Sequence, residues 1–286
     1  MKLLHLPFIF LVISLWMSSS AQAQQTPVIT GTPFSIGETL HLPSQVLNED
    51  RVLNIYLPSD YAPDSVRYHV LYLFDGSAEE DFIHIAGLVQ FATFPWINMM
   101  PPTIVVGIGN TERFRDFTSP AETDEFRNEF PASGGSEAFM DFMEKEVIPL
   151  VEERYAVDTL STLIGQSMGG LMATEVLLTR PGLFDQYIIV SPSLWWNDGS
   201  MLKAGHKLSG VEGPKRKVCI AVGEEGDIMK GAARDLKNLL QASYPDQAEV
   251  SYAYYPEADH GNVLHLAAYN AILSLFPQPA KVKETE

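Results

Sequence analysis

The chain has 286 residues, a formal net charge of −17 and a single cysteine. This acidity argues against nucleic acid or an anionic membrane as a partner, because both are bound through basic patches. One cysteine, Cys219, excludes an internal disulfide and leaves no basis for a cysteine-based zinc site. We expect Cys219 to be buried as a small apolar side chain.

The first 23 residues have the pattern of a secretory signal peptide. Lys2 precedes an apolar run at residues 3–16, and residues 21–23 read AQA, a small-x-small cleavage pattern. The run is shorter than the ~20 apolar residues that span a bilayer. We therefore predict cleavage after Ala23, a secreted or periplasmic protein, and no membrane insertion of the mature chain.

Residues 34–276 are predicted to form one α/β domain. The alternating pattern of RVLNIYLP, after the turn signal LNED, predicts a half-buried strand in an antiparallel opening. Later apolar runs are typical of strands buried on both faces, and helical patterns separate them. The expected strands are HVLYLFDG, PTIVVGIGN, STLIG, QYIIVSPS, KVCIAVG and VSYAYYP, and the expected helices cover residues 79–93, 136–155, 169–180, 228–243 and about 263–276.

This alternation predicts a mostly parallel sheet with helices on both faces. An antiparallel hairpin is expected at its N-terminal edge, and the short segment 197–216 leaves no room for a large cap domain. Residues 277–286 are predicted to be a disordered tail.

Ser167 is the candidate nucleophile. Residues 165–169 read GQSMG, a G-x-S-x-G pattern between an expected strand and an expected helix, which is the setting of a nucleophile elbow. Such a serine adopts a strained backbone conformation, so Gly165 and Gly169 are needed to leave room around it. The alternative is a tight turn without chemistry.

A serine nucleophile needs a base, and His260 is the best placed histidine. It follows the last expected strand, in the position that the order of a serine–acid–histidine triad requires.

The acid should follow the strand before, where three acidic residues occur together. We favour Glu225, then Asp227, then Glu224. Their alternative role is to favour the N-terminus of the next helix.

Two backbone amides should form an oxyanion hole. One is expected from Met168, directly after the nucleophile. The other comes from the loop after HVLYLFDG, where Gly76 or Ser77 fits and Ser77 is preferred.

Several stretches together resemble a known family. YLFDGS, GQSMGG, SPSLWWN, VGEEGD and ADHGNV occur in this order and resemble the esterase D / enterobactin-esterase-like family of α/β-hydrolases, over about residues 34–276. RFRDFTSP is similar to the siderophore-esterase branch. The resemblance implies an α/β-hydrolase fold, Ser167 as nucleophile, His260 as base, and the amides of Ser77 and Met168 as the oxyanion hole. The acid departs from the pattern, because many relatives carry it where this chain has Gly226.

The surroundings of the site suggest a bulky substrate. Trp195 and Trp196 follow a strand at the carboxyl edge, where one ring is expected to line the substrate pocket and at least one to pack in the core. Arg113 and Arg115 can bind an acidic or catecholate group, or pair with Asp116 and nearby glutamates.

The expected function is hydrolysis of a small-molecule carboxylic ester, of siderophore type or otherwise bulky. No metal or organic cofactor is expected. The open alternatives are a feruloyl or acetyl carbohydrate esterase, an acyltransferase of the same fold, a serine peptidase and a non-catalytic binding protein.

Overall fold

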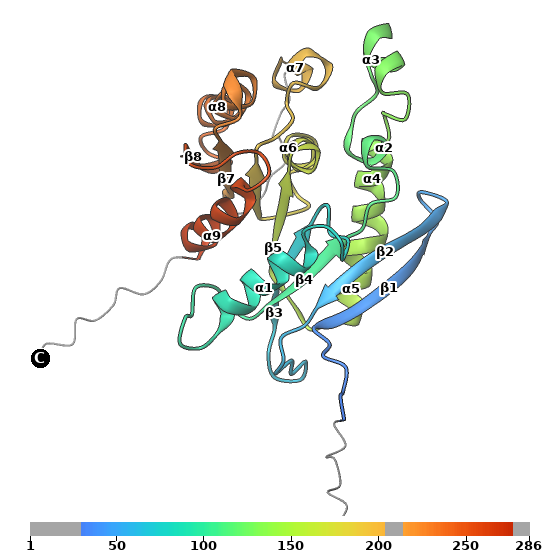
Figure 1. Ribbon diagram of the computed structural model, residues 1–286, viewed down its shortest axis with the longest axis vertical. Coiled ribbons are helices and arrows are strands. Elements are labelled where there is room, and N and C mark those ends of the chain that lie inside the picture. The colour runs from blue at the N-terminus through green and yellow to red at the C-terminus, as the bar shows by residue number, and fades with distance from the viewer. Residues whose placement is uncertain (1–29, 204–213, 277–286) are drawn as a thin grey trace, which may run out of the picture. The chain divides into compact units, whose positions relative to one another are not determined.

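A mixed β-sheet organises the domain that begins at Ser35. The computed structural model describes residues 30–203 and 214–276. Its sheet has eight strands in the order β1-β2-β4-β3-β5-β6-β7-β8 (Figure 1). The strands are β1 (Gly37–Ser44), β2 (Glu49–Tyr56), β3 (Tyr68–Leu73), β4 (Thr103–Ile108), β5 (Val157–Gln166), β6 (Gln186–Val190), β7 (Arg216–Gly223) and β8 (Ala248–Tyr255).

The strand pairings follow the prediction. β2 pairs antiparallel with β1 and with β4, and all other neighbours from β4 to β8 are parallel. The mostly parallel sheet with an antiparallel N-terminal hairpin is therefore confirmed. The predicted signal peptide at residues 1–23 and the predicted tail at residues 277–286 lie outside the described residues.

Helices cover both faces of the sheet, as predicted. The apolar side chains of β3 alternate between two cores: Val70 and Tyr72 belong to one, Leu71 and Leu73 to the other. The helices are α1 (Phe82–Thr93), α2 (Arg113–Phe117), α3 (Asp124–Glu129), α4 (Ser136–Phe142), α5 (Ile148–Arg154), α6 (Met168–Thr179), α7 (Trp196–Lys203), α8 (Gly226–Ser243) and α9 (Val263–Leu275). Helices α1 and α9 close the second core, and α4, α5, α6 and α8 pack against the first.

The single helix predicted at residues 136–155 contains an irregular turn. A π-helical turn, η1 (Met143–Val147), separates α4 from α5. Pro149 lies in the first turn of α5. Proline has no N–H, and its ring clashes with the carbonyl four residues earlier, so the wider turn accommodates it without ending the helix.

No helix among the described residues combines the length and the apolar character that a bilayer crossing requires. Between β6 and β7 the described residues contain one helix, α7.

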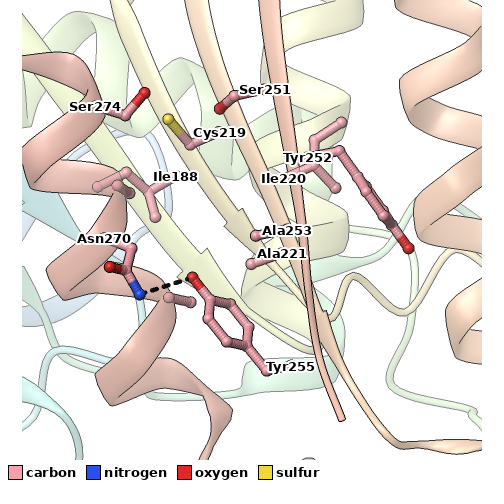
Figure 2. A pocket seen from close by; sticks show the side chains of 12 residues that line it. Ile188, Cys219, Ile220, Ala221, Ser251, Tyr252, Ala253, Tyr255, Asn270 and Ser274 are labelled. Carbon is pink, nitrogen blue, oxygen red and sulfur yellow. Dashed lines mark hydrogen bonds between the residues drawn. The ribbon is translucent and has the colours of Figure 1, made fainter.

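A cavity of about 160 Å³ lies between α9 and strands β6 to β8 (Figure 2). The thiol of Cys219 lines it together with Ser251 and Ser274, and Asn270 donates a hydrogen bond to the Tyr255 hydroxyl at 3.0 Å. Cys219 is buried, as predicted, and burial raises the pKa of its thiol. A buried thiol with a raised pKa is a poor nucleophile, so this cavity offers no cysteine chemistry.

His69 on β3 makes the stability of the fold depend on pH. The residue is 3% exposed, its Nε2 lies 2.8 Å from the Thr162 hydroxyl oxygen, and burial lowers its pKa to about 4. In the unfolded chain His69 is protonated as the pH falls below about 6.5, whereas in the folded chain it stays neutral down to about pH 4. The contribution of His69 is therefore fully present above pH 6.5 and is lost as the pH falls towards 4.

We expect this loss to amount to about 2–3 kcal/mol of unfolding free energy between pH 7 and pH 4. Urea unfolding of the wild type and His69→Gln over this range measures it, because the other titrating groups cancel in the difference. His41→Gln, which removes an exposed histidine on β1, should keep the wild-type slope. A His69→Gln slope equal to that of the wild type would contradict the prediction.

Candidate active site

The turn between β5 and α6 holds Ser167 in a strained conformation. Its φ and ψ are 59° and −120°, a region that non-glycine residues rarely adopt. A Cβ built at Gly165 would lie 2.3 Å from the Gly169 carbonyl oxygen, so only glycine fits there. The predicted elbow between strand and helix is therefore present.

Neighbouring backbone fixes this elbow on both sides. The Ser167 amide donates to the Val190 carbonyl at the end of β6, and the Ser193 amide donates to the Ser167 carbonyl, both at 3.0 Å. The hydroxyl oxygens of Ser167 and Ser193 are 3.4 Å apart. The strain is thus held in place by hydrogen bonds from the segment that follows β6.

His260 lies in the loop between β8 and α9 and contacts Glu225. Its Nδ1 is 2.5 Å from Glu225 Oε2. The imidazole is 47% exposed, whereas the carboxylate is 3% exposed. With Glu225 ionised, Nδ1–H donates to it and Nε2 is left as the acceptor.

The other two acidic candidates face elsewhere. Glu224 pairs with Lys230 at 2.6 Å and accepts a hydrogen bond from the Tyr254 hydroxyl. The Asp227 side chain is fully exposed and 3.8 Å from Lys230. The structure therefore brings Glu225, and neither neighbour, onto His260.

The elbow and the histidine loop are joined by Gln166. Its Nε2 donates to the His260 carbonyl at 2.5 Å. Among the described residues no hydrogen bond joins Ser167 Oγ to the His260 ring. In ligand-free active sites such bonds are often long and shorten when substrate binds.

The loop after β3 lies against the elbow. A Cβ at Gly169 would be 3.0 Å from Asp75 Oδ2 and 3.3 Å from Phe74 Cβ. The Gly76 amide donates to the Ile108 carbonyl at 2.9 Å, so it is not available to a ligand. The Ser77 amide donates to Glu80 Oε2 at 3.3 Å, and the Glu80 side chain is exposed.

The amide of Met168 begins α6. N–H groups in the first turn of a helix have no acceptor within that helix. They also lie at the positive end of the helix dipole. This amide is therefore suited to a developing negative charge.

Both predicted arginines bind carboxylates of the protein itself. Arg113 forms a bidentate pair with Asp75, with Nε–Oδ1 at 2.6 Å and Nη2–Oδ2 at 2.8 Å. Arg115 contacts Glu49 at 2.6 Å and Asp116 at 2.8 Å. These pairs organise the loops after β3 and β4, and a contact with substrate stays a prediction.

An acidic cluster surrounds the Asp75 loop. Asn110 Nδ2 donates to Asp75 Oδ1 at 2.7 Å and to Glu80 at 3.0 Å. Burial, followed by the charges of Asp75 and Glu80, raises the pKa of Asp81 to about 6.

The two tryptophans differ in burial. Trp196 is 1% exposed, packs against Phe126 and Phe130, and donates through Nε1 to the Ser119 carbonyl at 3.2 Å. Trp195 is partly exposed and lines an open groove of about 640 Å³ between α7 and α8. The core role expected for at least one ring therefore falls to Trp196.

Three residues that contact the site, Gln166, Ser191 and Ser193, were not among the predicted site residues. Ser191 Oγ donates to Glu225 Oε1 at 2.5 Å. The signal was available in the stretch SPS, because β6 lies between β5 and β7 and the carboxyl ends of parallel strands meet at one edge. Among the described residues no group of three or more His, Cys, Asp or Glu side chains forms a metal-binding cluster.

Comparison with known proteins identifies the family of the chain. The family model described as "Putative esterase" matches residues 44–261. The chain is also 31% identical over 243 residues to the apo-salmochelin esterase of Escherichia coli O6:H1, an alignment that covers 78% of this chain and 74% of that protein. The chain belongs to this esterase family.

Two further similar proteins show the fold and how much of each chain is matched. The ferri-bacillibactin esterase BesA of Bacillus subtilis is 34% identical over 170 residues, which cover 54% of this chain and 58% of that protein. The matched segment thus spans less than two thirds of that relative. The crystal structure of an IroE-like serine hydrolase from Shewanella oneidensis matches with a TM-score of 0.73 and 29% identity, covering 84% of this chain and 80% of that chain. The predicted α/β-hydrolase fold is confirmed.

Proposed function

We propose that the protein hydrolyses carboxylic esters through a covalent acyl-serine intermediate on Ser167. The observation that carries the proposal is the strained elbow of Ser167 beside a histidine whose Nδ1 is 2.5 Å from a buried carboxylate. This combination exposes a nucleophile and supplies an oriented base, which are the two requirements of a serine esterase.

The reaction proceeds in two halves. Ser167 Oγ attacks the ester carbonyl carbon while its proton moves to His260 Nε2, and Glu225 stabilises the imidazolium. The C–O bond to the alcohol then breaks, and His260 returns the proton to the leaving oxygen. Water repeats the sequence on the acyl-serine and releases the carboxylic acid and free Ser167.

The carbonyl oxygen becomes negatively charged during each attack, and we assign its stabilisation to the amides of Met168 and Ser77. The Ser77 amide has Glu80 as its acceptor, at a long 3.3 Å. Because the Glu80 carboxylate is exposed, water can solvate it when a substrate oxygen takes its place. The Met168 amide lies at the N-terminus of α6, where the positive end of the helix dipole also stabilises the negative charge on the oxygen.

We further propose a siderophore-type or similarly bulky ester as substrate. Two similar proteins are named as esterases of salmochelin and of ferri-bacillibactin. Trp195 lines the open groove between α7 and α8 and follows Ser193, whose hydroxyl oxygen is 3.4 Å from that of Ser167, by two residues. We assign a large acyl group to the aromatic surface of this groove. Secretion or export to the periplasm stays a prediction from the sequence of residues 1–23.

Labelling with a fluorophosphonate probe tests the nucleophile. We expect the wild type to be labelled at Ser167, and Ser167→Ala to lose the label. Ser193→Ala is the matched control, because Ser193 carries the nearest alternative hydroxyl, 3.4 Å away. Labelling of Ser167→Ala at the wild-type level, or loss of label in Ser193→Ala alone, would overturn the assignment.

A substrate panel tests the reaction class. Siderophore lactones, feruloyl sugars, short p-nitrophenyl esters and peptide amides are compared by kcat/KM. We expect ester turnover, with the lactones preferred. Turnover of amides without turnover of esters would refute ester hydrolysis, and preference for feruloyl sugars would refute the siderophore substrate alone.

A further inference from the structure

Ser191, the residue directly after β6, combines three features that its position in the sheet does not require. Its side chain is fully buried. Its φ is +43°, in the left-handed region that favours glycine. Its hydroxyl donates a 2.5 Å hydrogen bond to Glu225 Oε1. A serine kept in a conformation that glycine adopts more easily points to a use for its hydroxyl.

The two oxygens of Glu225 have separate partners. Oε1 accepts from Ser191 Oγ at 2.5 Å and from the Gly223 amide at 2.9 Å. Oε2 lies 2.5 Å from His260 Nδ1. Two donors on Oε1 prevent the carboxylate from rotating about its last bond, so Oε2 is kept facing the imidazole.

The local backbone explains how Ser191 reaches Glu225. The Ser191 amide donates to the Ala221 carbonyl of β7 at 2.7 Å. This bond continues the β6–β7 ladder by one residue, so Ser191 lies beside the end of β7, and Glu225 follows that end by two residues. The left-handed φ directs the hydroxyl across this short gap.

We propose that Ser191 is a positioning residue, whose hydroxyl anchors the Glu225 carboxylate so that it orients His260 and stabilises the imidazolium. This inference rests on the proposed function. Within the described part of the chain no hydrogen bond joins the Ser191 hydroxyl to Ser167 or to the His260 ring, and its bond to Glu225 makes that carboxylate the route of its effect.

Ser191→Gly separates this role from a purely structural one. Glycine removes the hydroxyl and also relieves the left-handed strain, so we expect the Tm to be unchanged or raised. We expect kcat/KM for p-nitrophenyl butyrate to fall about 10–100-fold, the range that corresponds to a hydrogen bond to a charged group. We also expect the acidic limb of kcat/KM to move to lower pH, because a freely rotating carboxylate stabilises the imidazolium less.

Ser136→Ala is the matched control. Its hydroxyl donates to the Glu175 carboxylate at 2.8 Å, and Ser136 is 1% exposed, so the variant loses the same kind of buried bond. This pair joins α4 and α6, and in the described segments neither residue forms a hydrogen bond with His260 or Glu225. We expect Ser136→Ala to keep the wild-type kcat/KM and pH profile, whatever it does to the Tm.

The double variant Ser191→Gly/Glu225→Gln decides whether Ser191 acts through the acid. We expect Ser191→Gly to lower kcat/KM much less in the Glu225→Gln background than in the wild type, because the two residues act as one unit. A wild-type kcat/KM and pH profile for Ser191→Gly, or an undiminished loss in the double variant, would overturn the proposal. If Glu225→Gln itself has wild-type kcat/KM, the triad of the proposed function fails instead.

Discussion

Replacing Glu225 by glutamine is expected to lower kcat/KM for ester hydrolysis by about 10³–10⁴-fold, the range found when the acid of a serine triad loses its charge. The physical reason is the 2.5 Å contact with His260 Nδ1. An amide NH₂ group in this place would favour the wrong imidazole tautomer, and an amide oxygen would stabilise the imidazolium poorly. Steady-state kinetics with p-nitrophenyl butyrate measure the effect.

The neighbouring acids provide controls of the same chemistry. Glu224→Gln removes a carboxylate that pairs with Lys230, and Asp227→Asn removes one that is fully exposed. We expect both variants to stay within about twofold of the wild type, since surface ion pairs contribute little. A loss in either variant that exceeds the loss in Glu225→Gln would show that the acid has been wrongly assigned.

Gly165→Ala is expected to destabilise the fold by about 3 kcal/mol or more and to abolish most activity. The added Cβ would lie 2.3 Å from the Gly169 carbonyl oxygen and 2.5 Å from its carbonyl carbon. Both atoms are backbone, so β5 and α6 must move apart. Such a shift displaces Ser167, and a misplacement of about 1 Å costs on the order of 10² in rate.

Gly87→Ala is the control for a glycine substitution. Gly87 is exposed in α1, and a Cβ there meets nothing within 4 Å. Alanine should therefore stabilise the protein by about 0.5–1 kcal/mol and leave ester turnover unchanged. Urea unfolding and kinetics of both variants check the pair. Equal stability of Gly165→Ala and the wild type would contradict the steric argument.

The fold could be predicted from the sequence because the patterns that specify each strand and helix lie within a few consecutive residues. Continuous apolar runs such as HVLYLFDG and QYIIVSPS become β3 and β6, and the G-x-S-x-G spacing becomes the elbow. The irregular turn η1 was not predicted, because the wider helical turn before Pro149 leaves the apolar periodicity almost unchanged.

The partners of individual side chains were harder to predict from the sequence. The sequence left three acids open within four residues, and the tertiary structure places Glu225 against His260 Nδ1. For Arg113 the sequence left open an acidic or catecholate ligand or a pair with Asp116 and nearby glutamates, yet Asp75, 38 residues earlier, holds it in a bidentate pair. This ion pair joins two loops that follow different strands, so no pattern of neighbouring residues in the sequence predicts it.

The sequence by itself therefore determined the α/β order, the elbow glycines and the chain order of serine, acid and histidine, because these depend on periodicity and on steric limits within a few residues. Only the tertiary structure decided that Glu225 faces His260, that Ser191 anchors Glu225, and that the Gly76 amide is occupied. These facts depend on strand order: β3 lies beside β4, and β7 lies between β6 and β8. The carboxyl ends of these neighbouring strands therefore bring together groups that lie from 32 to 35 residues apart along the chain.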